Sequence, residues 1–303
     1  MKIYRTIDEM RGAVQRARGE GKRVGLVPTM GALHEGHLSL VRAARASSEF
    51  VVVSIFVNPL QFGPKEDLAK YPRPFEKDVA LLEAEKVDAV FAPGAEEMYG
   101  VGQRAEGRGQ GKESAEVTFV EVPGLSGRLD GRSRLGHFRG VATVVAKLFQ
   151  IVQPQVAFFG QKDAAQVAVL RKMVRDLNFD VELRVMPIVR ERDGLAMSSR
   201  NAYLNPEERK QALVLHRALM RVQAMADRGE HDARKLEQIG REVMAEEPGA
   251  KVDYFEVVDP ETLEPVERVG NGALVAVAAW VGSTRLIDNL LLTAPAGAEG
   301  TLH

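Results

Sequence analysis

The stretch VPTMGALHEGHLSLVRAAR, residues 27–45, decides the fold. The apolar run VGLVPT that leads into it predicts a short buried strand, which Pro28 and Gly31 bring to an end. After HEGH, the apolar side chains at positions 38–44 recur at helical spacing, and this predicts a helix. His34 and His37 are therefore expected at the point where a strand gives way to a helix.

The start of a helix is a suitable place for a phosphate, because its backbone N–H groups are free and its dipole is positive there. Gly36 removes a side chain between the histidines and lets a phosphate or a flat ring approach the backbone. Two imidazoles at that place can donate to phosphate oxygens as negative charge develops. A half-made metal site and a solvated turn are the alternatives. The order of strand, glycine turn, histidines and helix favours the phosphate site.

A metal site is not expected, because the chain has no cysteine, six histidines in all, and no H-E-x-x-H or similar ligand spacing. The composition is typical of a soluble globular protein, with 303 residues, 45% hydrophobic and 27% charged. The net charge of −1 gives no electrostatic case for a nucleic-acid or membrane partner. No apolar run reaches membrane-spanning length, and the N-terminus lacks the apolar core of a signal peptide. We therefore expect a cytoplasmic protein.

Further along the chain, FVVVSIFV at 50–57 is a continuous β-branched and aromatic run, which predicts a parallel strand buried on both faces. Asn58 and Gln61 follow it, at a strand end where ligands bind in open α/β sheets. Asn58 also fits a turn former before a proline. Gln61 stands between Leu60 and Phe62 and fits a pocket residue better than a turn residue.

A second junction of strand, glycine and helix is expected at VAFFG, which ends at Gly160. Lys162 follows in the first helical turn, where the dipole disfavours a cation, so either an anion is held nearby or the lysine is simply solvated. Gln166 comes four residues later, on the same helical face. In MSSR, residues 197–200, two hydroxyls and a guanidinium offer donors to phosphate.

The remaining pattern predicts an α/β fold with a Rossmann-like parallel-sheet domain at 1–185 and a smaller α+β domain at 186–303. Thr6 and Glu9 have the spacing of a capping box, and Asn205 is expected to cap a helix that begins at Pro206. Residues 100–116 are rich in glycine and charge and predict a mobile surface loop. Further helices are expected at 6–18, 75–86, 141–152, 206–226 and 232–246. Further strands are expected at 87–93, 117–122, 252–259, 274–281 and 284–292, and one more within 181–205.

Five motifs stand in order along the chain: PTMGALHEGH, FVNPLQFGPKEDLAKYPR, GHFRGVATVVAKLFQIVQP, FFGQKD and DGLAMSSRN. Together with the C-terminal TRLIDN, the set resembles the pantothenate synthetase (pantoate–β-alanine ligase) family over nearly the whole chain. The resemblance implies a cytoplasmic, homodimeric ligase that takes ATP with Mg²⁺ as a substrate complex and has no tightly bound cofactor. It implies that pantoate and ATP give pantoyl adenylate, which β-alanine then converts to pantothenate and AMP.

The family motifs also imply site residues. His37 is the catalytic donor, with His34 beside it and Lys162 as a third catalytic group. Gln61 contacts pantoate and β-alanine, Gln166 contacts pantoate, and Asn58 is assigned to the substrate site as well. The implied ATP-binding residues are Met30, Gly31, Ala32, Leu33, His34, Glu35, Gly36, His37, Gly160, Gln161, Lys162, Asp163, Val189, Met197, Ser198, Ser199 and Arg200.

The chain departs from the family pattern at GQKDAAQ, where the usual order is G-E-K-D, an aromatic residue and two glutamines. Gln161 replaces the acid, and Ala164 and Ala165 replace the aromatic residue and the first glutamine. These departures bear on the packing beneath the pantoate pocket. A nucleotidyltransferase acting on another acceptor and a non-catalytic nucleotide-binding protein are the competing hypotheses. A tRNA-charging enzyme is disfavoured by the near-zero net charge.

Overall fold

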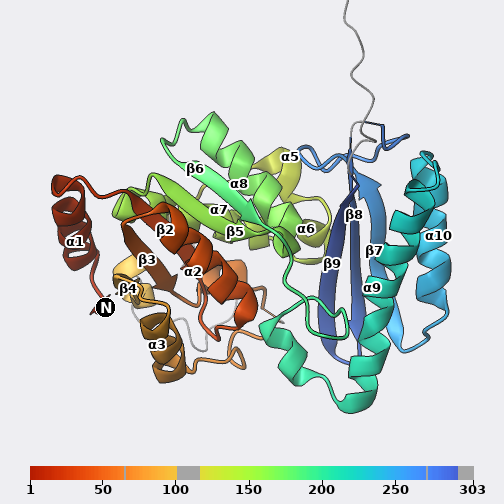
Figure 1. Cartoon of the computed structure of the whole chain (residues 1–303), viewed down its shortest axis with the longest axis horizontal. Helices are drawn as coiled ribbons and strands as arrows, with labels where there is room; N and C mark the ends of the chain where they lie inside the picture. The colour runs from red at the N-terminus through yellow and green to blue at the C-terminus, as the bar shows by residue number, and fades with distance from the viewer. Residues whose placement is uncertain (65, 101–116, 271, 293–303) are drawn as a thin grey trace, which may run out of the picture. The chain divides into compact units, whose positions relative to one another are not determined.

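The structure is a computed structural model that describes residues 1–64, 66–100, 117–270 and 272–292. Residues 101–116 of the predicted loop lie outside the described residues. The chain forms two compact units (Figure 1). The parallel-sheet unit comprises Met1–Gly127, Gly131–Gly160 and Val169–Pro187, and the antiparallel-sheet unit comprises Arg128–Asp130, Gln161–Ala168 and Ile188–His303. The domain boundary at residue 186 stays a prediction.

In its described residues, the first unit is built on six strands, and every strand pair there is parallel. The strand order is β1-β4-β3-β2-β5-β6. This confirms the predicted Rossmann-like α/β sheet. The strands are β1 (Lys2–Tyr4), β2 (Val24–Thr29), β3 (Phe50–Ile55), β4 (Ala89–Phe91), β5 (Val156–Gly160) and β6 (Glu182–Met186).

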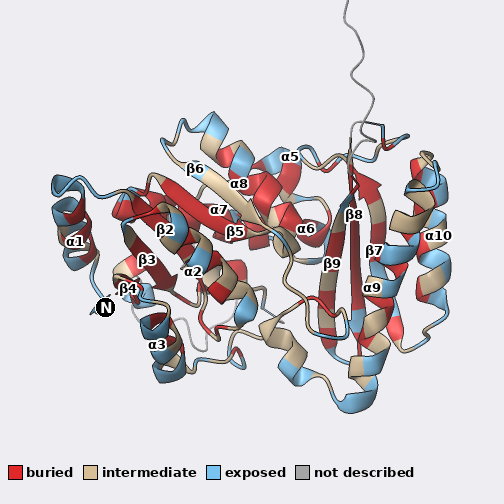
Figure 2. Cartoon of the chain, in the orientation of Figure 1, coloured by how far each residue is buried: buried red, intermediate tan, exposed pale blue. Residues whose placement is uncertain are grey.

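The central strands are buried along most of their length, as Figure 2 shows. The predicted capping box at the start of α1 is confirmed, with Thr6 and Glu9 bonded reciprocally. Val27, Val41, Val53, Leu82 and Phe158 are among the residues of one apolar cluster that joins the sheet to its helices. The longer helices are α1 (Ile7–Gly19), α2 (Glu35–Ser47), α3 (Phe75–Ala84), α7 (His137–Val152) and α8 (Ala164–Asp176), of which α8 begins in the second unit.

The order of the strands reverses between β2 and β5. From β2 the chain adds β3 and then β4 on one side, and later it adds β5 and β6 on the other side. The carboxyl ends of the two neighbouring strands are Thr29 and Gly160. Open α/β sheets bind ligands outside the strand ends at such a reversal. The topology therefore points to the segments that follow these two residues.

The predicted strand at 117–122 is wrong, because that segment has no strand in the structure. Instead, the Val120 N–H donates to the Thr143 hydroxyl on α7 over 2.9 Å, and the Arg139 guanidinium lies 4.6 Å from the centre of the Phe119 ring. Side chains of one helix, α7, therefore hold this segment, and no strand pairs with it. The short elements of the unit are η1 (Pro59–Gln61), α4 (Ala95–Tyr99), α5 (Pro123–Ser126) and α6 (Asp130–Ser133), whose first residue belongs to the second unit.

The second unit confirms the predicted order of two helices followed by three strands. The helix α9 begins with Pro206 after a capping box between Asn205 and Glu208. The core of the unit joins the helices to the sheet through residues such as Leu215, Phe255 and Val275. The elements are η4 (Gln161–Asp163), η5 (Ser199–Tyr203), α9 (Pro206–Ala226), α10 (Ala233–Ala245), β7 (Ala250–Val258), β8 (Ala273–Val281) and β9 (Thr284–Leu292), and the three strands form an antiparallel sheet in this order.

Within the described part of the chain, no helix is both long and apolar enough to cross a membrane.

Candidate active site

A tight turn after β2 carries the chain to the histidines. Gly31 has φ +83° and Ala32 has φ +51°, so both lie in the left-handed region. The carboxylate of Asp78, on α3, accepts from the N–H of Ala32 and from the N–H of Leu33, each over 2.8 Å. A Cβ at position 31 would lie 3.0 Å from a carboxylate oxygen. Asp78 thus holds the turn, and a glycine at position 31 lets it come close.

Asp78 is 1% exposed, and sequence reasoning did not select it. Burial raises the pKa of this carboxyl, and the two backbone N–H bonds act in the opposite direction without cancelling that effect. The available signal was an acid on the apolar stripe of a predicted helix, three residues after Phe75 and four before Leu82. An acid at such a position indicates a buried partner, although the sequence does not say which.

His34 and His37 cap the start of α2 in a reciprocal arrangement. The Nδ1 of His34 accepts from the N–H of Gly36 over 3.2 Å. The Nδ1 of His37 accepts from the N–H of His34 over 3.4 Å, and the ring centres are 4.1 Å apart. The structure thus brings the two predicted catalytic histidines together at a helix N-terminus.

These two caps select the tautomer of each ring. A neutral imidazole has one N–H donor and one acceptor nitrogen, and here Nδ1 is the acceptor in both rings. The proton of each neutral ring therefore lies on Nε2. Two Nε2–H donors at a positive helix end suit a ligand with clustered negative charge.

Glu35, within the predicted ATP-binding stretch, is exposed and pairs with Arg42 further along α2. The hydrogen bond from Arg42 lowers the pKa of the Glu35 carboxyl. The Glu35 side chain therefore lies along the surface of α2. Only the backbone of Glu35 contributes to the start of the helix.

The Gln61 side chain is buried in the structure and oriented at both ends. Its Oε1 accepts from the Asn58 Nδ2 over 3.1 Å, and its Nε2 donates to the Met30 sulfur over 2.8 Å. The Asn58 Nδ2 also donates to the Gly140 carbonyl, and its Oδ1 accepts from the N–H of Leu60 and from the Tyr99 hydroxyl. All the hydrogen-bonding groups of the Asn58 amide thus have protein partners. Its role here is to orient Gln61, while its predicted contact with substrate stays a prediction.

His137 supports the same segment through the backbone of Gln61. Its Nδ1 lies 2.8 Å from the Gln61 carbonyl oxygen, which only accepts, so His137 donates there. Its Nε2 lies 3.0 Å from an Arg134 nitrogen, and Arg134 forms two hydrogen bonds with the Glu66 carboxylate. This arrangement is that of a structural histidine.

In the second unit, the predicted residues Gln161, Lys162 and Asp163 form the short helix η4, directly before α8. Lys162 therefore lies in a tight turn ahead of α8, whereas the sequence pattern placed it inside the helix. Its ammonium group is 3.5 Å from the Asp163 carboxylate. Gln166 is half-buried in α8, between the buried side chains of Ala165 and Val167.

Val189 and the segment 197–200, which are also predicted to bind ATP, lie in the second unit and are held mainly by bonds to backbone groups. The Met197 N–H donates to the Val189 carbonyl over 3.0 Å, and Ser198 caps η5 by accepting from the Arg200 N–H over 3.3 Å. Ser199 and Arg200 begin η5. The sequence predicted this group as a phosphate site, and the structure places its four residues together on one short turn.

An ion pair between the half-buried Arg190 and the buried Asp288 lies next to this group. Arg190 forms two hydrogen bonds with the Asp288 carboxylate, and Asp288 is 3% exposed. His216, on α9, packs so closely beside Gly194 that a Cβ there would lie 2.3 Å from the ring. Burial, and then the Arg190 charge, lower the pKa of His216 from its ordinary 6.5, while Asp288 raises it less.

We expect His216 to give this unit an acid-sensitive stability. Because its pKa is lowered on folding, neutral His216 contributes stability above pH 6.5, and this stability is lost as the pH falls through the lowered pKa. Thermal unfolding of the wild type and of His216→Gln, followed between about pH 8 and pH 5, should show a smaller acid loss in the variant. Identical pH dependence in the two proteins would contradict this.

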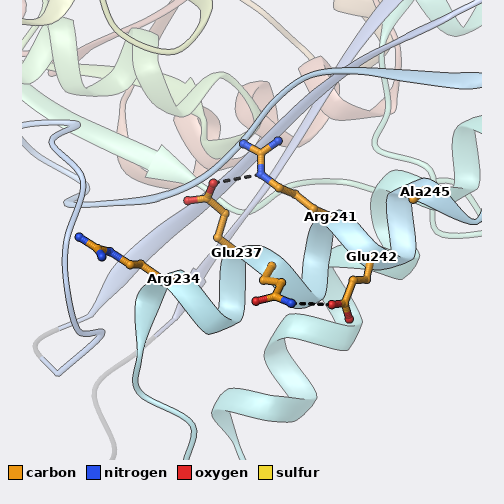
Figure 3. A pocket seen from close by; sticks show the side chains of 6 residues that line it. Arg234, Glu237, Arg241, Glu242 and Ala245 are labelled. Atoms are coloured by element: carbon orange, nitrogen blue, oxygen red, sulfur yellow. Dashed lines mark hydrogen bonds and ion pairs between the residues drawn. The ribbon is translucent and has the colours of Figure 1, made fainter.

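A surface hollow lies along α10, and the residues that line it are not among the predicted site residues. It is lined by Arg234, Glu237, Gln238, Arg241, Glu242 and Ala245, all on that one helix. Figure 3 shows Glu237 bonded to Arg241 along the helix surface. The Gln238 amide donates to the Glu242 carboxylate one turn further on. No residue of the five motifs lines it, so it adds nothing to the site.

Comparisons with known proteins agree with one another. The profile of the pantoate–β-alanine ligase family matches residues 2–291. Pantothenate synthetase of Koribacter versatilis is 63% identical over 300 residues, 99% of each chain. The crystal structure of pantothenate synthetase from Thermus thermophilus superposes with a TM-score of 0.87 at 48% identity, over 96% of this chain and 99% of that one. Pantoate–β-alanine ligase from Francisella tularensis, solved in complex with β,γ-ATP and β-alanine, gives a TM-score of 0.74 at 30% identity, over 96% and 97%.

A parallel sheet with a glycine turn and paired histidines at its point of strand reversal is typical of a nucleotide-binding protein. The comparisons identify the family within that class. The chain belongs to the pantoate–β-alanine ligase family, and it is an enzyme of pantothenate biosynthesis.

Proposed function

We propose that the chain uses ATP to join pantoate to β-alanine through a pantoyl adenylate, giving pantothenate, AMP and pyrophosphate. One observation carries the chemistry, namely the two histidines whose Nδ1 atoms cap α2 and whose Nε2 atoms therefore carry the N–H donors. The direct test is to measure AMP formation with pantoate, β-alanine and ATP, and again with each acid omitted. Transfer of the nucleotidyl group without β-alanine-dependent release of AMP would favour a nucleotidyltransferase acting on another acceptor.

In the first step, a carboxylate oxygen of pantoate attacks the α-phosphorus of ATP, and the bond to pyrophosphate breaks. The pantoate carboxylate is itself the nucleophile, so the protein need only align it and stabilise the charge that moves to pyrophosphate. His34 and His37 donate to phosphate oxygens from the start of α2. Lys162, Ser198, Ser199 and Arg200 are the further donors that we assign to the nucleotide.

In the second step, the β-alanine amine attacks the acyl carbon of the adenylate, and AMP leaves. The main demand on the protein is then to orient an amine toward a reactive carbonyl. Gln61 suits this because its neutral amide can bond a hydroxyl, a carboxylate or an ammonium without adding charge. The bonds from Asn58 and to Met30 already orient that amide. We assign Gln166 to pantoate alone.

We propose that Mg²⁺ enters with ATP, as part of the substrate. Among the described residues, no group of three or more histidine and acidic side chains gathers to hold an ion. ATP brings its own phosphate oxygens, which are ligands that Mg²⁺ prefers. We further propose that the enzyme is a cytoplasmic homodimer with no tightly bound cofactor, and that it takes no nucleic-acid or membrane partner. Gel filtration with light scattering tests the dimer.

We expect Gln61→Ala to raise the KM for pantoate by roughly tenfold to a hundredfold, because the enzyme–substrate complex loses hydrogen bonds to a charged substrate. The KM for ATP should change by less than about threefold, since no ATP contact is assigned to this side chain. Steady-state kinetics with each substrate varied in turn gives both values. Gln238→Ala, at an exposed position on α10, is the matched control. Equal effects on both substrates would count against the assignment.

A further inference from the structure

The side chain of Asn289, on β9, is bonded to the turn that carries Lys162. Its Nδ2 donates to the carbonyl oxygens of Gln161 and Lys162, each over 2.9 Å. Its Oδ1 accepts from the Gln161 Nε2 over 3.1 Å. Asn289 is 3% exposed, so these bonds are formed away from water, where each is costly to lose.

The pattern of bonds fixes which way the Asn289 amide faces. Reversing the amide would set its oxygen against two carbonyl oxygens and its NH₂ group against the Gln161 NH₂ group. Gln161 therefore locks the orientation, and Asn289 in turn holds two successive carbonyls of η4. This arrangement needs an amide at position 161, where the family pattern usually has an acid, because a carboxylate has no N–H to donate.

The strand that carries Asn289 is itself held by neighbouring side chains. Asp288 accepts from the Asn289 N–H over 2.8 Å and pairs with Arg190. Earlier on β9, Arg285 pairs with Asp130 and Asp253. The motif TRLIDN thus supplies anchors at 285 and 288 and the amide at 289.

We propose that Asn289 is a positioning residue for Lys162 and that Gln161 sets its orientation. The inference rests on the proposed function, because it takes Lys162 as a donor to the nucleotide. Two fixed carbonyls define the peptide planes on both sides of the Lys162 Cα atom, and these planes set the direction in which its side chain leaves the backbone. Without them, the ammonium group must be positioned at the moment of reaction, which lowers the rate without removing the group itself.

A double-mutant cycle tests this. Asn289→Asp keeps the shape and replaces the donor with an acceptor. Lys162→Met keeps the stem and removes the ammonium group. If Asn289 acts through Lys162, Asn289→Asp should lower pantoate-dependent exchange of labelled pyrophosphate into ATP by roughly tenfold to a hundredfold in the wild type, and by less than about threefold in the Lys162→Met background. Asn178→Asp, at an exposed position, is the control for the added charge.

Equal loss in both backgrounds would overturn the proposal, because a merely structural role affects both alike. If Lys162→Met alone leaves the exchange unchanged, the assigned role of Lys162 fails, and the positioning role fails with it. An enzyme with no pantoate-dependent exchange even in the wild type would instead refute the proposed function. If Asn289→Asp does not fold, Gln161→Met removes only the locking donor and takes its place in the same cycle, with a smaller expected loss and the same requirement of non-additivity.

Discussion

His37→Ala should lower pantoate-dependent pyrophosphate exchange by about a hundredfold to a thousandfold, the usual effect of removing one donor to a developing negative charge. The reaction of supplied pantoyl adenylate with β-alanine should keep much of its rate. The difference arises because negative charge moves onto pyrophosphate in the first step, next to the helix start. The second step takes place at an acyl carbon, with AMP as a good leaving group. The two assays therefore separate the half-reactions.

Two further variants separate the roles of the two ring nitrogens. His37→Asn places an oxygen near the position of Nδ1, so it retains the cap on His34 and loses the distal donor. His37→Gln places an NH₂ group near the position of Nε2 and loses the cap. We expect Gln to restore more exchange activity than Asn, and Asn to restore more thermal stability than Gln. His231→Ala serves as the control. If both half-reactions fall by the same factor in His37→Ala, the proposed division of labour is wrong.

Gly140→Ala should disable the enzyme without replacing any residue assigned to substrate. The added Cβ would lie 2.3 Å from the Leu60 carbonyl oxygen and 2.6 Å from the Gln61 nitrogen, and both atoms belong to the backbone. The backbone that carries Gln61 must then move, and the Asn58 bond to the Gly140 carbonyl is strained with it. Overpacking of this kind costs about 1–3 kcal/mol of folding free energy.

Because a displacement of about 1 Å at a reacting group can cost a hundredfold in rate, we expect the loss of kcat/KM in Gly140→Ala to exceed what its stability loss explains. The measurement pairs thermal unfolding with kinetics at a temperature where the variant is folded. Gly127→Ala is the matched control, because nothing lies within 4 Å of the Cβ there and its φ is −100°. A fully active Gly140→Ala would show that the 58–61 segment tolerates displacement.

The elements that could be predicted from the sequence are those defined by local patterns. Continuous apolar runs marked β2, β3 and β5, and the capping pattern at Asn205 marked the start of α9, because burial on both faces and cap chemistry are written within a few residues. The segment 117–122 has the same local composition as a strand. Its state depends instead on Thr143 and Arg139 of α7, which no local pattern reveals.

The candidate site divides in the same way. His34, His37 and Gln61 are chemically distinctive and follow strands, so their types and positions indicate a role. The residues that hold them are ordinary in sequence and distant along the chain. Asp78 lies 46 positions from Ala32, and Asn289 lies 127 positions from Lys162. Pairings over such separations are set by the topology of the whole chain, which a single sequence does not display.

The position of Asn289 on β9 has a consequence for the order in which a newly made chain matures. Protein synthesis runs from the N-terminus and domains fold as they emerge, so the parallel sheet and the histidine-capped helix are complete while residue 289 is still unmade. A nascent chain that ends before β9 carries Lys162 but has no amide to hold the two carbonyls of its turn. Translation thus supplies the anchor of Lys162 127 residues after the lysine itself, and chains that stop before β9 lack it however well their first sheet has folded.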